Sequence, residues 1–431
     1  MRLILKKKWI SFAFIALIAA IVSVVFFLKS SQPTLIYPDR KSGKRTGDAG
    51  VISASGIRYS LELLKAHAEI SNVPGYQMAV YHRDSLVLST AIGYSDLTTY
   101  EPLTPRHLMR IGSVSKPLTA FAAMKLVEEG KLELDNEINK YVDFPEKEWS
   151  ITVRDLLCHQ GGIRHYTGKS DVFRVEHYDD VTSALAIFRN DPLMFEPGTQ
   201  FGYSSFGYNL LSAVIEDAAG MPFLEYMRKT FRKIGLKDIL ADQKDSLSYK
   251  RSNFFIKSKG GFVEAPFEDL SYKWASGGFL SNANTLAKFG SLLLNREVLK
   301  NELTKKMFSD QNLNDGTKTG YGLGWIVGND LKDRKVYYHN GNLRSGRAFL
   351  VLYPDYNLSF AVTANTGTGI YLNEREVFGM IDALFFTKGK KELLEAAMPL
   401  EGVHSFKTVS LKNEEVRGII QLSIADGEVK G

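Results

Sequence analysis

The stretch RIGSVSKPLTAFAAMKLVEEG, residues 110–130, places a serine and a lysine at the start of a predicted apolar helix. Ser113 and Lys116 are three residues apart, and residues at that spacing share one face of a helix. We therefore expect the Lys116 amine to lie against the Ser113 hydroxyl. The positive end of the helix favours negative charge on the serine oxygen, and that field and burial together lower the pKa of the lysine. Pro117 suits the first helical turn, where its missing N–H loses no hydrogen bond.

The Ser-x-x-Lys motif is weak evidence when taken alone. A chain of this length contains about one or two by chance, although this one is the only occurrence. The alternative interpretation is a serine that caps the helix and a lysine in solvent. Other segments must decide between the two.

A second segment, FEPGTQFGYSS at 195–205, places Tyr203 after a Pro-Gly turn and before an apolar helix. A tyrosine there can point into a cleft. Beside Lys116 we expect the pKa of its phenol to fall, so that it relays protons. The alternative is an ordinary core aromatic, one of 20 tyrosines in the chain.

A third segment, YYHNGN at 337–342, ends a predicted strand at His339. Gly341 lets a ligand lie close to the strand edge. Backbone N–H groups of that edge can then donate to a carbonyl oxygen.

In this order and spacing the three segments resemble the motifs of the serine β-lactamase and penicillin-binding-protein superfamily, in its class C β-lactamase and D-peptidase branch. The family pattern Ser-x-x-Lys, Tyr-x-Asn and Lys/His-x-Gly reads here SVSK (113–116), YSS (203–205) and HNG (339–341). The resemblance extends from about residue 55 to residue 387. Further matching segments are ITVRDLLCHQGGI (151–163), WASGGFLS (274–281), YGLGW (321–325) and VTAN (362–365). GIRHY (162–166) and the YSS variant are similar to the mitochondrial serine β-lactamase-like subgroup and its bacterial relatives.

The resemblance implies a catalytic group of Ser113, Lys116 and Tyr203. Ser113 would be the nucleophile that forms an acyl-enzyme, and the other two would activate it and shuttle its proton. The backbone N–H groups of Ser113 and Asn342 would form the oxyanion hole.

The resemblance also implies substrate-binding roles for Ser205, His339, Gly341 and Asn342. Two of these depart from the family pattern. Ser205 stands where the family has asparagine, and His339 stands where many members have lysine, which would make a positive charge there pH-dependent. Both changes are more typical of general hydrolases than of efficient antibiotic-destroying enzymes. The segment 164–166, Arg-His-Tyr, either lines the mouth of the cleft or has a structural role.

The fold expected is α+β, with an antiparallel sheet built from both chain ends, flanked by helices, and a mostly helical region inserted between them. Runs 76–82 and 86–93 form a hairpin, and strands return at 320–328, 335–341, 347–354 and 358–365. Helices are expected at 54–70, near 117–129, 206–219 and 284–295, and at 374–386. Gly130 and Gly220 would end two of these helices.

The net charge of +6 belongs to the N-terminus. Nine of the 54 bases and one of the 48 acids lie up to Arg45, a charge of +8, which leaves 45 bases and 47 acids in the remainder, a charge of −2. The body therefore gives no reason to expect a nucleic-acid partner. Residues 9–28 carry no charge and are long enough to span a bilayer, and bases precede them.

These features predict a cytoplasmic basic segment (1–8), a transmembrane anchor (9–28), a tether (29–50), a hydrolase domain (51–387) and a C-terminal tail of unknown role (388–431). The catalytic domain would be extracytoplasmic, in the periplasm or outside the cell. A cleaved secretory signal is the alternative to an anchor.

No metal or cofactor is expected, because no H-E-x-x-H, P-loop or G-x-G-x-x-G motif occurs, and no G-x-S-x-G elbow either. Cys158, the only cysteine, is interpreted as buried filler rather than a nucleophile beside His159. The leading hypothesis is a membrane-anchored serine hydrolase that acts on a small-molecule or peptide substrate: a D-peptide, cell-wall fragment, ester or β-lactam. The alternative is a catalytically silent scaffold on the same fold.

Overall fold

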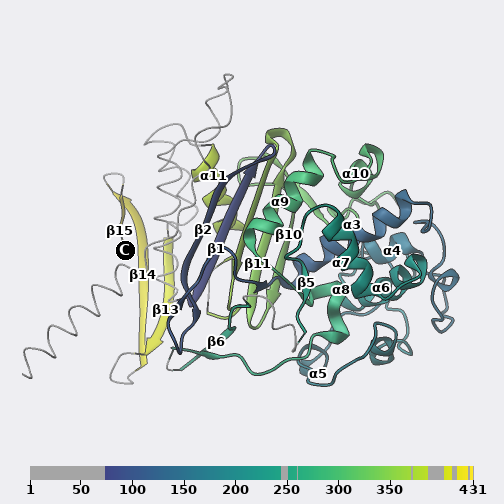
Figure 1. The fold of residues 1–431 in the computed structure, drawn as a ribbon, viewed down its shortest axis with the longest axis horizontal. Helices are drawn as coiled ribbons and strands as arrows, with labels where there is room; N and C mark the ends of the chain where they lie inside the picture. The colour runs from purple at the N-terminus through teal and green to yellow at the C-terminus, as the bar shows by residue number, and fades with distance from the viewer. Residues whose placement is uncertain are drawn as a thin grey trace, which may run out of the picture.

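The computed structural model describes residues 73–243, 251–259, 261–369 and 372–386, and the backbone of 402–409, 415–425 and 428–430. An antiparallel sheet with the order β3-β2-β1-β12-β11-β10-β9 forms the centre (Figure 1). Segments from the two ends of the described chain meet where β1 pairs with β12, as the sequence predicted. The strands are β1 Gly75–His82, β2 Ser85–Asp96, β3 Glu101–Pro102, β9 Ile326–Asn329, β10 Lys335–Leu343, β11 Gly346–Tyr353 and β12 Leu358–Ala364.

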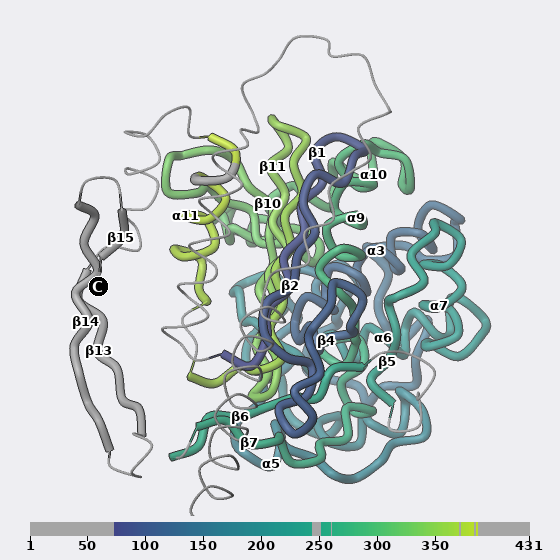
Figure 2. Tube along the Cα trace, turned by 60° about the vertical axis from the view of Figure 1, so that its left-hand side comes forward, coloured from purple at the N-terminus to yellow at the C-terminus, as the bar shows by residue number. Residues whose placement is uncertain are grey.

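Helices cover both faces of this sheet, so its central strands are apolar on both sides. Helix α11 (Glu374–Phe385) packs on one face, where Met78 and Val362 belong to its cluster. Helix α9 (Ala283–Leu294) packs on the other, where Ala79 and Ala361 point. Figure 2 shows the sheet between these two helices.

The helical region lies beyond α9, on the side of the sheet away from α11 (Figure 1). The helices of this region are α3 Ser115–Glu128, α4 Val153–Leu157, α5 Lys169–Val172, α6 Ser205–Ala219, α7 Phe223–Lys233, α8 Trp274–Gly277 and α10 Asn301–Met307. Two short sheets with the orders β4-β8-β5 and β6-β7 accompany the central sheet. The short strands are β4 Met109–Arg110, β5 Leu240–Ala241, β6 Phe255–Ser258, β7 Gly261–Glu264 and β8 Phe279–Ser281.

Most of the predicted helices and strands are confirmed, because residues close together in the sequence specify them. Helices α3, α6, α9 and α11 fall within two residues of the expected ranges, and Gly130 and Gly220 have the positive φ of helix-ending glycines. The strand expected at 320–328 is wrong over its first part. Only Ile326–Asn329 is β9, because Gly324 takes a φ of +84° and breaks the extended run.

Two predictions fall outside the described residues: the helix at 54–70 and the anchor at 9–28. Among the residues described, no helix is long and apolar enough to cross a bilayer. The C-terminal tail, whose role the sequence left unknown, contains a three-stranded antiparallel sheet of β13 (Gly402–Val409), β14 (Glu415–Ala425) and β15 (Glu428–Lys430).

Helix α11 begins with a reciprocal cap that can be tested. The Asn373 side chain accepts from the N–H groups of Arg375 (2.9 Å) and Glu376 (3.3 Å), and the Glu376 carboxylate accepts from the Asn373 N–H at 3.0 Å. We expect Asn373→Ala to lower the free energy of unfolding by about 1 kcal/mol, and Asn373→Asp to keep most of it. Urea denaturation measures both, and equal midpoints for the alanine and aspartate variants would contradict this role of the cap.

Candidate active site

Lys116 is the centre of the candidate site. Its side chain is fully buried on α3, and its Nζ donates to the carbonyl oxygen of Ser276 at 2.9 Å. The same Nζ lies 3.1 Å from Ser205 Oγ and 3.3 Å from Ser113 Oγ. Three segments far apart in the sequence thus meet on one amine.

Burial sets the protonation of this amine. Removal from water lowers the pKa of Lys116 well below its ordinary value, and the positive charge of Lys273 lowers it further. The predicted direction is therefore confirmed. The alternative of a capping serine and a solvated lysine is wrong, because Lys116 is inaccessible and no side chain caps either the 3₁₀ turn Gly112–Val114 or α3.

Tyr203 also joins the site, but its pKa differs from the prediction. Lys116 Nζ lies 4.7 Å from the centre of its ring, and the Ser113 side chain interacts with the Tyr203 hydroxyl. Burial raises the pKa of the Tyr203 phenol, and the interaction with Ser113 offsets only part of that rise. The expected fall of the Tyr203 pKa is wrong, and its hydroxyl stays protonated.

Ser205 is placed by the turn that precedes α6. Ser204 caps this helix, with its Oγ accepting from the Gly207 N–H at 2.9 Å and donating to the Arg164 carbonyl at 2.8 Å. The Ser205 N–H donates to Nδ1 of His165 at 3.1 Å. The Ser205 hydroxyl is therefore held where it meets Lys116, in place of an asparagine amide.

Two glycines allow the 3₁₀ turn that carries Ser113 to touch the edge of β10. A Cβ on Gly341 would lie 1.9 Å from the Ile111 carbonyl oxygen and 3.1 Å from the Ser113 backbone nitrogen. A Cβ on Gly112, whose φ is +52°, would lie 2.9 Å from the Asn342 backbone nitrogen. The backbone nitrogens expected to form the oxyanion hole thus belong to two segments in direct contact.

His339 is brought to the site, but without the charge that was expected. It is buried, and burial together with Lys116 lowers its pKa to about 3. Its Nδ1 lies 2.6 Å from the Asn340 carbonyl oxygen, which only accepts, so Nδ1 carries the proton. Nε2 then accepts from the Tyr321 hydroxyl at 3.0 Å. A pH-dependent positive charge near neutrality is therefore wrong, because the ring is neutral above about pH 3.

Sequence reasoning missed the role of His159. Its Nδ1 accepts from the Ser204 N–H at 3.1 Å, and its Nε2 has no hydrogen-bond partner among the described residues. Aromatic rings surround it, with the centroid of Tyr203 at 4.3 Å and that of Tyr321 at 4.8 Å. Burial lowers the pKa of His159 well below its ordinary value. His159 and Tyr321 stand within the family-like segments 151–163 and 321–325, which were the sequence signal for them.

A second layer of charge was also missed. Lys273 is buried and donates to Glu268 Oε1 at 2.7 Å. Arg110 Nε donates to Asp242 Oδ2 at 2.6 Å, and its Nη1 lies 3.6 Å from Glu268 Oε2. The sequence signal for this layer was the family-like segment 274–281, which directly follows Lys273. Its Ser276 carbonyl accepts from Lys116.

The segment 164–166 has structural contacts and also reaches the site, where the Tyr166 side chain interacts with Ser205 and Ser276. Arg164 pairs with Asp171 and Asp191, while His165 receives the Ser205 N–H. The Tyr166 ring stacks on His165 with centroids 4.6 Å apart. Cys158 is buried and its thiol pKa is raised by that burial, which confirms its interpretation as filler.

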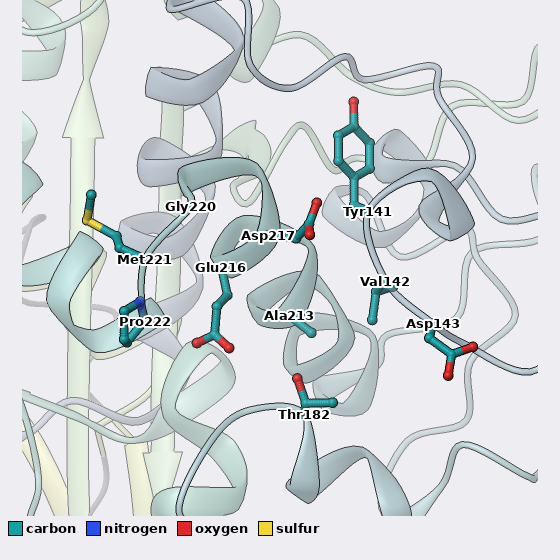
Figure 3. Close-up of a pocket in the computed structure, with 10 residues that line it drawn as sticks. All are labelled: Tyr141, Val142, Asp143, Thr182, Ala213, Glu216, Asp217, Gly220, Met221 and Pro222. Atoms are coloured by element: carbon teal, nitrogen blue, oxygen red, sulfur yellow. The ribbon is translucent and has the colours of Figure 1, made fainter.

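An open cavity lies away from this site. Figure 3 shows its lining, with Glu216, Asp217 and Gly220 at the C-terminal end of α6, whereas Ser205 begins that helix. Its volume is about 460 Å³. At 1.5 Å per residue the length of α6 separates the two by roughly 20 Å. Within the described ranges no three His, Cys, Asp or Glu side chains gather as metal ligands.

Comparisons with known proteins find relatives of this chain. The Beta-lactamase family model matches residues 62–376. The human mitochondrial serine beta-lactamase-like protein LACTB is 33% identical over 311 residues, which is 56% of this chain and 57% of that protein. The chain thus spans little more than half of that relative's length.

Two solved structures show the same fold. The octameric penicillin-binding protein homologue from Pyrococcus abyssi is 21% identical with a TM-score of 0.66, covering 86% of this chain and 94% of its own. The D-amino acid amidase from Ochrobactrum anthropi SV3 is 19% identical with a TM-score of 0.65, covering 76% and 97%.

The close contact at Gly112 and Gly341 predicts how a substitution there affects stability. Gly341→Ala places a methyl group against the Ile111 carbonyl, so we expect the free energy of unfolding to fall by about 1–3 kcal/mol or more. Gly328→Ala in β9 is the matched control, because nothing lies within 4 Å of its added Cβ. Urea denaturation compares them. Equal stability of the two variants would show that the turn and β10 are not in contact.

Proposed function

The chain belongs to the β-lactamase family, and from that premise we propose a membrane-anchored serine hydrolase that works through an acyl-enzyme on Ser113. The observation that carries the proposal is the buried Lys116 amine, 3.3 Å from Ser113 Oγ and with its pKa well below the ordinary value. A lysine that is neutral at working pH can accept the serine proton, which a charged one cannot.

In the acylation step, Ser113 Oγ forms a bond to the carbonyl carbon of the substrate while its proton moves to Lys116 Nζ. The bond from that carbon to the leaving group then breaks. Lys116 then gives this proton to the leaving group, with the Tyr203 hydroxyl, which lies beside Lys116 and Ser113, as the proposed relay. Water, activated by the same pair, hydrolyses the ester and restores Ser113.

The carbonyl oxygen gains negative charge during this attack. We assign its stabilisation to the backbone N–H groups of Ser113 and Asn342, which lie on the turn and strand in contact. Gly341 permits this contact. We assign Ser205 and His339 to substrate contact and to holding the site, with His339 acting as a neutral group.

The substrate class proposed is an amide or ester: a D-peptide, a cell-wall fragment, a small ester or a β-lactam. The amidase among the fold relatives supports amide chemistry on this scaffold. The alternative is a catalytically silent scaffold. The intact arrangement of Ser113, Lys116 and Tyr203 favours the enzyme, since a scaffold gains nothing from a buried lysine that has lost its solvation.

The location proposed rests on the N-terminal sequence. Residues 9–28 would anchor the chain in a membrane with the hydrolase domain, residues 51–387, outside the cytoplasm. Removal of the same residues as a secretory signal is the alternative, which N-terminal sequencing of the mature protein distinguishes.

A fluorophosphonate probe tests the nucleophile. We expect the wild-type protein to be labelled at one serine and Ser113→Ala to lose the label entirely, because the probe bonds to an activated serine oxygen. Ser115→Ala, two residues on, is the control for a change in the same turn. A wild type that resists the probe under conditions that label an active relative would refute the enzyme, and label retained in Ser113→Ala would refute the nucleophile.

Lys116→Arg tests the base. Arginine keeps a cation but cannot release its proton, so we expect the rate of labelling to fall roughly 10²–10⁴-fold. Lys125→Arg, on the same helix, is the control. Because the pKa of Lys116 is lowered, its neutral fraction persists at neutral pH and is lost as pH falls through that pKa, so the wild-type rate should fall on the acid side. Wild-type rates in Lys116→Arg would contradict the assignment.

A further inference from the structure

We infer that Lys273 is a positioning residue of the reaction: paired with Glu268, it fixes a positive charge behind the Lys116 amine and anchors the turn whose Ser276 carbonyl binds that amine. This inference rests on the proposed function, since it concerns the base of the same site. It extends the assigned catalytic group, because Lys273 acts through Lys116 and not on the substrate.

Lys273 is a buried cation with a buried carboxylate partner. Its Nζ donates to Glu268 Oε1 at 2.7 Å and to the Val172 carbonyl oxygen at 3.2 Å. Glu268 is buried as well, and Arg110 Nη1 lies 3.6 Å from its second carboxylate oxygen. Removing two charges from water costs about as much free energy as their attraction returns. The pair is therefore better explained by the charge that it holds in place than by a gain in stability.

The backbone at Lys273 leads directly to the partner of Lys116. Lys273 ends the 3₁₀ turn Ser271–Lys273, and α8 begins at the next residue. The Lys273 carbonyl accepts from Ser276 Oγ at 3.3 Å, and the Ser276 carbonyl accepts from Lys116 Nζ at 2.9 Å. Because one short turn contains both carbonyls, the anchored Lys273 side chain also holds the carbonyl that orients Lys116.

The two buried lysines have different partners. Lys273 has a carboxylate, whereas Lys116 Nζ lies within 3.3 Å of three neutral oxygens, two from hydroxyls and one from a carbonyl. Two buried ammonium groups repel each other, so the proton stays on the amine that has a carboxylate beside it. Burial lowers the pKa of Lys273 while Glu268 opposes this fall, but burial and Lys273 both lower the pKa of Lys116. Lys116 is thereby left neutral and able to accept the Ser113 proton.

The histidines and tyrosines around the two lysines add no charge. Burial lowers the pKa values of the histidines and raises those of the tyrosines, which are His159, His165, His339, Tyr166, Tyr203, Tyr208 and Tyr272. On the far side of Glu268, Arg110 and the partly exposed Arg251 share the Asp242 carboxylate. The positive charge that acts on Lys116 is therefore that of Lys273.

The test is the pH dependence of the rate at which a neutral fluorophosphonate labels Ser113 in the full-length protein. Protonated Lys116 cannot accept the serine proton, so the wild-type rate falls on the acid side, through the Lys116 pKa. Lys273→Met removes the cation and fills its space with an apolar chain. The ammonium form of Lys116 is then less disfavoured and its pKa rises, so we expect the acid limb to move to higher pH by roughly one unit.

Two further variants separate charge from structure. Lys273→Arg keeps the cation and should keep the acid limb near the wild-type pH, even where a displaced carbonyl lowers the rate on the plateau. The double variant Lys273→Met with Glu268→Gln leaves no carboxylate buried without its partner. Its acid limb should also move to higher pH, by less than in Lys273→Met, because the unpaired carboxylate is gone.

Lys229→Gln, on α7, removes an exposed cation away from the site and should leave the acid limb unmoved. Circular dichroism at each pH establishes that every variant compared is folded.

An acid limb that stays at the wild-type pH in the double variant overturns the inference, even if the plateau rate falls, because a purely structural role lowers the rate at every pH. Equal displacement of the limb in Lys273→Arg and Lys273→Met overturns it too, since the charge is then not the cause. In both cases the acyl-enzyme on Ser113 stands. A wild type that the probe does not label refutes the proposed function, and this inference with it.

Discussion

Burial of the Lys116 amine beside Ser113 is the constraint that organises this molecule. An amine removed from water needs hydrogen-bond partners, and these come from Ser113, Ser205 and the Ser276 carbonyl. One partner lies 160 residues from Lys116 in the sequence, so α3, α6 and α8 must be packed together before the site exists. The sheet and its two covering layers of helix provide that rigidity.

Because little water reaches the site, the aromatic and histidine side chains around Lys116 carry no charge. Burial raises the pKa of Tyr203 and lowers those of His159 and His339, so all three remain neutral. Charge is confined to a second layer, where Lys273 and Arg110 are balanced by carboxylates. In such surroundings the developing charge of a reaction interacts strongly with fixed dipoles, which suits the backbone N–H groups proposed to receive it.

Backbone contact at two glycines connects this chemistry to the sheet. The turn that carries Ser113 rests on β10 only because Gly112 and Gly341 have no side chains. The same strand carries Asn342, whose backbone N–H is proposed to receive the developing charge. A shift of β10 would therefore move this N–H relative to Ser113.

The sequence by itself determined the elements and the central pair. Apolar periodicity and glycine positions located α3, α6 and α9, and the three-residue spacing placed Ser113 and Lys116 on one face, because both depend on neighbours along the chain. Tertiary structure alone decided the protonation of Tyr203 and His339 and the carbonyl partner of Lys116. A pKa depends on how much water is excluded, and here the excluding groups come from segments far apart in the sequence, which no local pattern encodes.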